Sequence, residues 1–509
     1  MPKLKTRTIR LHDVDNVVTA KTTLTAGTLI AEENVVCKDT IPSFHKIATT
    51  PIHKGEYVIK YGQVIGAASK EIQPGEHVHT HNIEMPTHKK KYSFGSDRKE
   101  MDFIPEQDRA VFQGIIRADG RVATRNYIGI IPTVNCSAGV ARFIADAFDK
   151  ENLSPFPNVD GVLAVVHGSG CGLADRGDGI EILRRTLSGW AQHPNFAGVL
   201  LVGLGCEINQ VETLADLIPI PKSTLFRTLN IQTLGGTSKT LSAGIEAVRE
   251  MLEKANQVQR RSVSASHLVI GLECGGSDAL SGITANPALG AAGDLVVRHG
   301  GTIILSETTE IYGAEQLLAR RAVNEDVGQK LIDRIHWWED YTKRHGMEIN
   351  NNPSPGNKAG GLTTILEKSL GAVSKSGSTN LMDVYQYAEG ISTNGLVFMD
   401  TPGYDVVSVT GMIAGGANII CFTTGRGSVF GSKPVPTIKL ASNSLMYQNM
   451  MDDMDINCGL IMDGKITVEE AGNNVFQKIL DSASGRKTKS EILGFGDVEF
   501  VPWQMGAVL

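Results

Sequence analysis

Short apolar runs that end in glycine-rich turns recur along most of the chain, and they constrain its fold most strongly. Residues 267–272 have the pattern of a buried strand, which is followed by a turn with Cys274, Ser277 and Asp278. A helix then begins near Asn286, because the next residue is a proline, which is tolerated in a first helical turn. This strand–turn–helix order predicts a parallel sheet covered by helices.

The same order appears in two long regions. Further strands are predicted from apolar runs at 128–134, 161–167, 198–205, 302–305, 396–400, 419–424 and 436–440. Helices are predicted at about 178–192, 237–258, 323–345, 362–372 and 467–483. Polar side chains follow many of the strands, and the carboxyl edge of an open α/β sheet is where ligands bind.

A chain of 509 residues is too long for one hydrophobic core. Residues 1–83 contain short strands separated by glycine and proline, which predicts a small all-β module. Residues 84–108 are charged and aperiodic, which is typical of a linker. Residues 109–260 and 261–509 form two predicted α/β domains with mostly parallel sheets.

The composition of the chain argues against several classes of protein. A formal net charge of −6 argues against a general nucleic-acid-binding protein, which would have a basic face. The sequence has no apolar run of about 20 residues and no secretory signal, so no membrane association is expected. Seven cysteines, an odd number, fit a reducing cytoplasm better than a disulfide framework. We expect a cytoplasmic homo-oligomer that binds a small molecule.

His77, His79 and His81 alternate along a predicted strand and would lie on one face of it. Neutral imidazoles in this arrangement suit a divalent transition metal. The alternative is an exposed polar strand face. For His45, an ordinary surface position is favoured over membership of the same site.

Four cysteines each follow an apolar strand, and they would gather at one sheet edge if those strands are neighbours. Their thiolates could hold iron, or three of them an iron–sulfur cluster. The alternative is that cysteine acts here as a small hydrophobic residue in buried turns. The four residues are Cys136, Cys171, Cys206 and Cys274.

Other polar residues stand at strand ends or in glycine-rich loops. Arg426 lies between two glycines and could grip a carboxylate, or it could be a surface turn. Glu307 and Glu310 could ligate metal or act as a base, and helix capping is the rival role. His167 is a candidate acid or base, and Lys358 a candidate ligand-contacting residue. Neither a dinucleotide-binding nor a P-loop glycine motif is present, which argues against those cofactors.

Four long motifs together resemble the altronate/galactarate dehydratase family. They are the stretch from Gly271 through Cys274 to Ala288, Asn352-Pro-Ser-Pro-Gly-Asn-Lys-Ala-Gly-Gly361, Phe422-Thr-Thr-Gly-Arg-Gly427 and Asp453-Met-Asp-Ile-Asn-Cys-Gly459. The first 83 residues are similar to the small β-clip (SAF-type) module of that family. His77-Val-His-Thr-His-Asn82 and Leu396-Val-Phe-Met-Asp-Thr-Pro-Gly-Tyr-Asp405 resemble its altronate branch.

The resemblance implies dehydration of D-altronate to 2-dehydro-3-deoxy-D-gluconate, in hexuronate breakdown, with iron(II) or manganese(II). From the residues we expect Glu307, His167 and Lys358 to be catalytic. Arg426, Ser277, Asp278 and Asn286 are expected to bind substrate, and the histidines and cysteines above to hold metal. Galactarate dehydration or a sulfolactate sulfo-lyase-like reaction is the alternative within the family. An NAD-dependent dehydrogenase and a non-catalytic sugar-acid-binding protein are alternatives of other classes.

Overall fold

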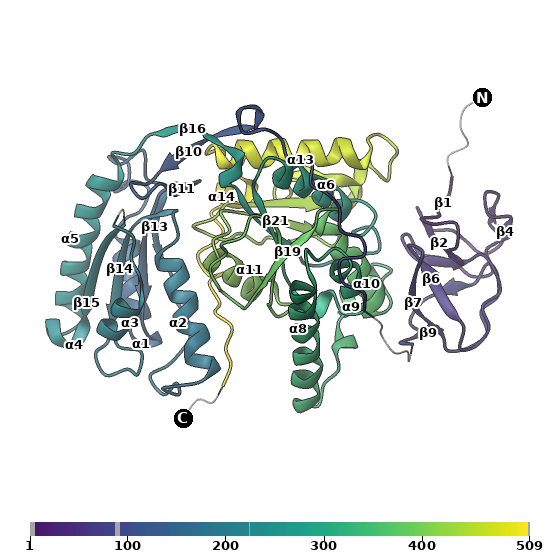
Figure 1. Cartoon of the computed structure of the whole chain (residues 1–509), viewed down its shortest axis with the longest axis horizontal. Coiled ribbons are helices and arrows are strands. Elements are labelled where there is room, and N and C mark those ends of the chain that lie inside the picture. Colours follow the sequence, from purple (N-terminus) through teal and green to yellow (C-terminus); the bar gives the residue numbers. More distant parts are fainter. Residues whose placement is uncertain (1–5, 87–91, 223, 507–509) are drawn as a thin grey trace.

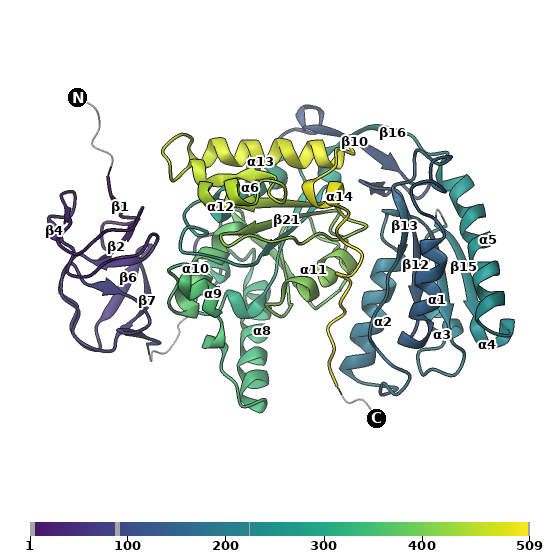
Figure 2. The same ribbon diagram turned by 180° about the vertical axis from the view of Figure 1, so that it is seen from behind.

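The computed structural model describes residues 6–86, 92–222 and 224–506. Three parts lie in a row, with the N-terminal module at one end and the second part at the other (Figures 1 and 2). The predicted fold class, a small all-β module followed by a large α/β region, is confirmed. No helix in the described part of the chain is both long enough and apolar enough to cross a membrane.

The N-terminal module is built from short antiparallel strands. One sheet has the order β1-β2-β5-β8, a second has β6-β7-β9, and β3 pairs with β4. Glycines and prolines at the turns keep the strands short, and valines and isoleucines fill two small cores. The strands are β1 (Thr8–Ile9), β2 (Val17–Ala20), β3 (Leu29–Ile30), β4 (Val35–Val36), β5 (Lys46–Ala48), β6 (Tyr57–Lys60), β7 (Gln63–Ala68), β8 (His77–Val78) and β9 (Ile83–Glu84).

The next part has a four-stranded parallel sheet of order β13-β12-β14-β15. Helices α1 and α5 pack on one face, and α2 and α3 on the other. Its elements are β12 (Tyr127–Pro132), α1 (Asn135–Asp146), β13 (Gly161–Ala164), α2 (Asp178–Ala191), β14 (Phe196–Gly203), α3 (Val211–Leu217), β15 (Leu225–Asn230), α4 (Ile231–Leu234) and α5 (Thr237–Ala255). An antiparallel sheet, β11-β10-β16, joins this part to the next through β10 (Val111–Ile116), β11 (Val122–Ala123) and β16 (Arg260–Ser264).

The C-terminal part has a seven-stranded parallel sheet of order β19-β20-β18-β17-β21-β22-β23. One face is covered by α6 and α13, and the other by α11 together with α2 of the preceding part. The strands are β17 (Val269–Cys274), β18 (Thr302–Leu305), β19 (Leu381–Tyr385), β20 (Gly395–Met399), β21 (Ile419–Thr424), β22 (Thr437–Ala441) and β23 (Ile456–Asn457). The helices are α6 (Ala285–Arg298), α7 (Glu315–Ala319), α8 (Glu325–Arg344), α9 (Pro355–Ala359), α10 (Ile365–Val373), α11 (Asp405–Ala414), α12 (Ser444–Asn449), α13 (Val468–Ala483) and α14 (Lys489–Leu493).

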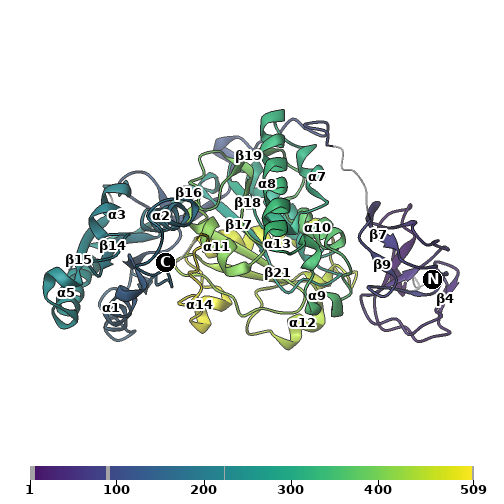
Figure 3. The ribbon, with the colours of Figure 1, turned by 90° about the horizontal axis from the view of Figure 1, so that it is seen from below.

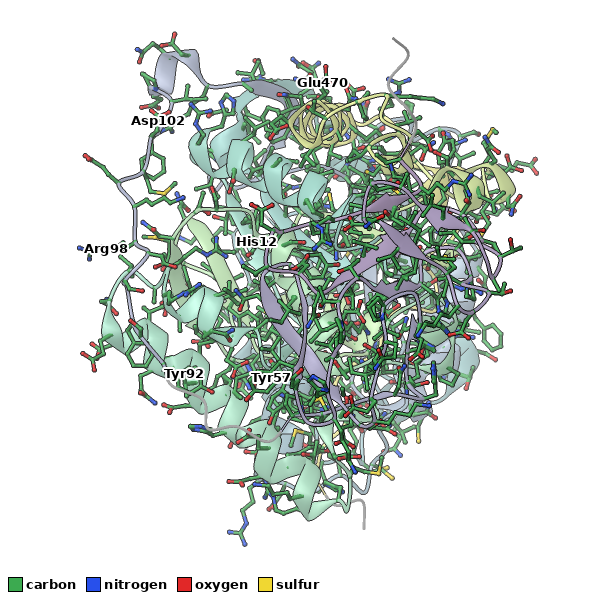
Figure 4. All side chains as sticks on the ribbon, turned by 90° about the vertical axis from the view of Figure 1, so that its right-hand side faces the viewer. His12, Tyr57, Tyr92, Arg98, Asp102 and Glu470 are labelled. Atoms are coloured by element: carbon green, nitrogen blue, oxygen red, sulfur yellow. The ribbon has the colours of Figure 1, made fainter. Side chains whose placement is uncertain are left out.

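The predicted linker, residues 84–108, is attached to the C-terminal part along much of its described length. Tyr92 donates a hydrogen bond to Glu315 at 2.8 Å, and the amide of Asp97 donates to the carbonyl of Arg320 at 2.8 Å. Arg298 pairs with Asp102 at 2.7 Å. Figure 4 labels Tyr92 and Asp102 along this path. Residues 87–91 of the predicted linker lie outside the described residues.

Candidate functional site

The carboxyl edge of the seven-stranded sheet holds a cluster of buried ionisable side chains. Cys274 ends β17, and Glu307 and Glu310 lie in the turn that follows β18. The sulfur of Cys274 lies 3.3 Å from Oε2 of Glu307 and 3.6 Å from Oε2 of Glu310. All three side chains are buried. The parallel sheet therefore brings Cys274 next to two carboxylates that lie more than 30 residues away in sequence.

Two buried lysines neutralise these carboxylates. Lys375 Nζ lies 2.7 Å from Oε2 of Glu307, and Lys368 Nζ lies 2.6 Å from Oε1 of Glu310. Asn352 also donates to Glu310, at 2.8 Å. A buried carboxylate needs such partners because its desolvation is costly. Since ammonium groups already occupy these positions, the cluster resembles an acid–base network more than a cation site.

Glu273, Glu307 and Asp405 form an overlapping group whose oxygens lie within 4.8 Å of one another. Burial, reinforced by the charge of Glu307, raises the pKa of Glu273 well above its ordinary value and that of Asp405 to about 7. Burial also opposes ionisation of Glu307, but Lys375 holds its pKa below the ordinary value. A neutral Glu273 beside an ionised Glu307 is the division of roles that a general acid and a general base require.

Two further features mark Glu307. Its φ of +65° lies in the left-handed region, which is uncommon for a residue other than glycine and costs on the order of 1 kcal/mol. Its Oε1 atom and that of Glu273 are buried without a hydrogen-bond partner among the described residues. Unsatisfied buried oxygens are rare in folded proteins and call for an explanation. Backbone strain and unpaired oxygens at one position are typical of functional sites.

The N-terminal module supplies a second group, made of His45, His77 and His79. One ring nitrogen from each of the three lies within 4.8 Å of the others, and His45 Nδ1 is 2.9 Å from His77 Nε2. Nδ1 of His79 is buried and has no hydrogen-bond partner among the described residues. Burial lowers the pKa of His77 to about 4 and that of His79 to about 3. Neutral, converging imidazoles fit a divalent transition metal.

This imidazole trio differs from the predicted one. Strand β8 ends at Val78, and the turn that follows interrupts the alternation that would have aligned His81 with His77 and His79. His81 is exposed and only its ring approaches that of His77, at 5.4 Å between centroids. His45 takes its place because β5 pairs with β8 in antiparallel register.

The module rests on α9 and α10 of the C-terminal part. His45 Nε2 lies 3.3 Å from the carbonyl oxygen of Ala359 in α9. Gly361 has a φ of +96°, and a Cβ there would lie 2.6 Å from the carbonyl oxygen of Phe44. Only glycine permits this close approach. The buried carboxylate of Glu367 in α10 receives Lys46 and Lys60, each at 2.9 Å.

Helix α9 connects the trio to the predicted substrate residues. Lys358, half-buried, directly precedes Ala359. Asn357 donates to the carbonyl of Ser277 at 2.9 Å, and the amide of Arg426 donates to the carbonyl of Gly276 at 2.9 Å. Arg426 is exposed. Hydrogen bonds thus connect α9, which follows on from the contact with His45, to the loop after Cys274 and to the backbone of Arg426.

Three predicted substrate-binding residues have structural partners. Asp278 is buried and accepts hydrogen bonds from Ser281 and Ser442, both at 2.9 Å. Asn286 donates to the carbonyl of Gly371 at 2.8 Å and accepts from Thr423 at 2.6 Å. The side chain of Ser277 is buried. Asp278 and Asn286 therefore hold the loop and α6 in place in this arrangement.

The other predicted residues belong to the four-stranded sheet. Cys136, Cys171 and Cys206 are exposed and follow β12, β13 and β14, so Cys274, in a different sheet, does not join them. His167 lies in the same part. Its Nε2 is 3.0 Å from the carbonyl of Pro132, and its Nδ1 accepts the amide of Ser169 at 3.2 Å. The structure thus separates His167 from Glu307.

Sequence reasoning missed several members of these groups. Lys368 and Lys375 are seven residues apart, a spacing that returns to one helix face, and this was the available signal. Glu273 precedes Cys274 inside a buried strand, where a charged residue is itself unusual. Asp405 follows the polar end of β20. The sequence around His45 gives no indication that it belongs to the trio, because only the pairing of β5 with β8 brings it next to His77.

Models of protein families match the three parts of the chain in order. Residues 6–86 match the "Altronate/galactarate dehydratase SAF domain". Residues 114–256 match the second domain of "D-galactarate dehydratase/Altronate hydrolase". Residues 265–508 match "D-galactarate/Altronate dehydratase, C-terminal".

Similar full-length proteins agree with these matches. An altronate dehydratase of Escherichia coli (strain K12) is 38% identical over 95% of this chain and 96% of its own length. An altronate dehydratase of Bacillus subtilis (strain 168) is 36% identical over 95% of this chain and 96% of its own. A galactarate dehydratase (L-threo-forming) of Escherichia coli (strain K12) is 37% identical over 94% of this chain and 93% of its own. The chain is therefore a lyase of the altronate/galactarate dehydratase family.

Proposed function

We propose that the chain dehydrates D-altronate to 2-dehydro-3-deoxy-D-gluconate, with iron(II) or manganese(II) held by His45, His77 and His79. The observation that carries the proposal is the contact of the imidazole trio with α9. His45 contacts the carbonyl oxygen of Ala359, the residue after Lys358. The candidate cation site thus contacts the residue that follows a candidate carboxylate-binding lysine in sequence. The unpartnered, buried Nδ1 of His79 supports the cation site.

The reaction removes the proton at C2 and expels the hydroxyl group at C3. The C2 proton is weakly acidic, because its loss places a second negative charge next to the carboxylate. Bound at the trio, the metal ion would supply electrostatic stabilisation of the enediolate. Lys358 and Arg426 bind the substrate carboxylate by charge-assisted hydrogen bonds.

Glu307 and Glu273 are assigned the two proton transfers. Glu307, ionised beside Lys375, accepts the C2 proton. Glu273, neutral in its buried position, gives a proton to the departing hydroxyl, which leaves as water. The enol product then loses the proton of its C2 hydroxyl and gains one at C3, which gives the 2-keto acid. His167 takes no part in this scheme because it lies in the other sheet.

A galactarate-dehydrating activity is the second candidate, because the galactarate dehydratase matches at 37% identity, between the 36% and 38% of the two altronate dehydratases. Protein purified without oxygen and loaded with iron(II) should convert altronate to a product that a carbonyl-trapping reagent captures. Conversion of galactarate alone would replace the proposed substrate. Binding of altronate without a keto product would show a sugar-acid-binding protein instead.

Matched variants test the residue assignments. Arg426→Ala should raise KM for altronate about tenfold or more, since one charged hydrogen bond contributes about 1.5 to 3 kcal/mol. Glu307→Gln should lower kcat by at least about a hundredfold, as expected for loss of a general base. Unchanged turnover in Glu307→Gln would remove that residue from the chemistry.

A further inference from the structure

Three exposed cysteines stand at one edge of the four-stranded sheet, and the proposed dehydration does not use them. Cys136, Cys171 and Cys206 follow β12, β13 and β14, which are adjacent parallel strands in the order β13-β12-β14. The sheet accordingly places all three residues at its carboxyl edge, with Cys136 on the middle strand. All three thiols are free.

The strand register aligns two of these cysteines. Pro132 pairs with Val202, and Cys136 and Cys206 each follow their member of that pair by four residues. The two residues therefore lie equally far along the chain from one aligned pair in neighbouring strands, Cys136 in the first turn of α1 and Cys206 in the loop before α3. Chance packing of a small hydrophobic residue would bury it, but these thiols are exposed.

Hydrogen bonds lock the three turns to one another. The amide of Asn135 donates to the carbonyl of Ser169 at 2.8 Å, which joins the turns of Cys136 and Cys171. Thr133 Oγ1 donates to Glu207 Oε1 at 2.6 Å, which joins the turns of Cys136 and Cys206. Each of these four residues is within three positions of a cysteine. The thiols consequently belong to one rigid frame, as a metal centre requires.

One of these cysteines lies at the N-terminus of a helix. Cys136 is in the first turn of α1, a helix of 12 residues whose N-terminus stabilises negative charge. The three sulfur atoms do not all lie within 4.8 Å of one another, unlike the ligand atoms of the histidine and carboxylate groups found among the described residues. A cluster of several irons spaces its thiolates more widely than one ion does.

We propose that Cys136, Cys171 and Cys206 hold an iron–sulfur cluster of the [4Fe–4S] type. Three thiolates leave one iron without a protein ligand from this set, so that iron is free for an oxygen ligand. This site is separate from the imidazole trio of the N-terminal module and does not depend on which sugar acid is the substrate.

The test uses the full chain, reconstituted without oxygen with iron(II) and sulfide. The wild-type protein should hold about four iron and four acid-labile sulfide per chain and show a visible absorption band that dithionite bleaches. Cys136→Ser, Cys171→Ser and Cys206→Ser should each lose at least half of both, with wild-type thermal unfolding because the residues are exposed. Cys37→Ala, in the buried core of the module, is the matched control and should keep the full content.

Alkylation of the wild-type protein gives a second readout that needs no variant. Mass spectrometry should find the three thiols protected from iodoacetamide after reconstitution and modified once the iron has been removed. Iron uptake without sulfide, cluster content unchanged in the serine variants, or unprotected thiols would overturn the proposal. Because no assay here uses substrate, failure to dehydrate altronate would contradict the proposed function and leave the cluster standing.

Discussion

The ammonium group of Lys46 lies 2.9 Å from Oε2 of Glu367, and both side chains are completely buried. Lys60 pairs with the other oxygen of the same carboxylate, also at 2.9 Å. One glutamate in α10 thus receives two lysines of the N-terminal module. This carboxylate joins the module that carries the imidazole trio to the C-terminal part, beside the contact of His45 with Ala359.

Replacing that carboxylate should loosen the module. Glu367→Gln leaves two buried ammonium groups without a counter-charge, so we expect the free energy of unfolding to fall by about 3 kcal/mol or more. Urea unfolding measures this loss, and small-angle scattering should show a larger radius of gyration. Glu71→Gln, at the exposed pair with His53, is the control and should change neither quantity. An unchanged radius for Glu367→Gln would mean that the remaining contacts, such as that of His45 with Ala359, are enough to hold the module.

The imidazole trio should bind a divalent ion. Removing one imidazole takes away a direct ligand, so His79→Ala should weaken manganese(II) binding at least about tenfold, as loss of even an indirect ligand contact does. Calorimetric titration of chelator-treated protein measures the affinity. His81→Ala is the matched control, since His81 is exposed and outside the trio. Equal losses in the two variants would show that the ion is not held by His45, His77 and His79.

Asp405 should make stability depend on pH. Burial, with the charges of Glu307 and Glu310, raises its pKa from 3.8 to about 7. A raised carboxyl pKa means that the folded state binds the proton more tightly, so the stabilisation is present at low pH and is lost as the pH rises toward 7. Asp405→Asn removes this dependence. The free energy of unfolding of the variant, relative to that of the wild type, should rise by on the order of 2 kcal/mol between pH 5 and pH 8. A pH-independent difference in denaturant unfolding would contradict the assignment.

Arg125 should couple the two α/β parts. It donates to both oxygens of Glu491 in α14, at 2.6 and 2.8 Å, and to the carbonyl of Ser482 at 2.8 Å. Although burial opposes ionisation of Glu491, Arg125 holds its pKa below the ordinary value. The contribution of the pair is therefore present at neutral pH and is lost as the pH falls through the lowered pKa.

Arg125→Met should therefore cost about 3 to 5 kcal/mol at pH 7 and less at acidic pH, for example at pH 3. Chemical denaturation at both pH values measures the difference. Arg486→Met, which breaks only the exposed pair with Asp481, should leave stability unchanged at either pH. A cost for Arg125→Met that is the same at pH 3 and pH 7 would assign it to packing of the side chain.

Much of the architecture could be predicted from local sequence. The strand predicted at 302–305 is β18, and the helix predicted at 178–192 is α2 within one residue. The apolar residues of these elements recur with a clear period, and the elements end in turns. Nearby residues therefore determine their secondary structure. The sheet edge near Cys274 was predicted for the same reason, because strand ends in a parallel sheet coincide.

The memberships of the sites were less predictable. Cys274 and Cys136 follow similar strands, yet they belong to different sheets, because strand order depends on contacts distant in sequence. Alternation of side chains along a strand predicts His81 as a member of the histidine site, but β8 ends at Val78. His45 enters through the pairing of β5 with β8. Local pattern fixes which residues end a strand, and only tertiary pairing decides which ends meet.

Helix α2 of the four-stranded part packs against α11 of the C-terminal part, and Trp190 donates to the carbonyl of Thr410 at 3.0 Å across this contact (Figure 3). The same apolar cluster includes Ile131 from one sheet and Ile420 from the other. Counting sheets would therefore suggest two independent folding units where there is one. Severing the chain between them would expose a continuous apolar surface on both halves.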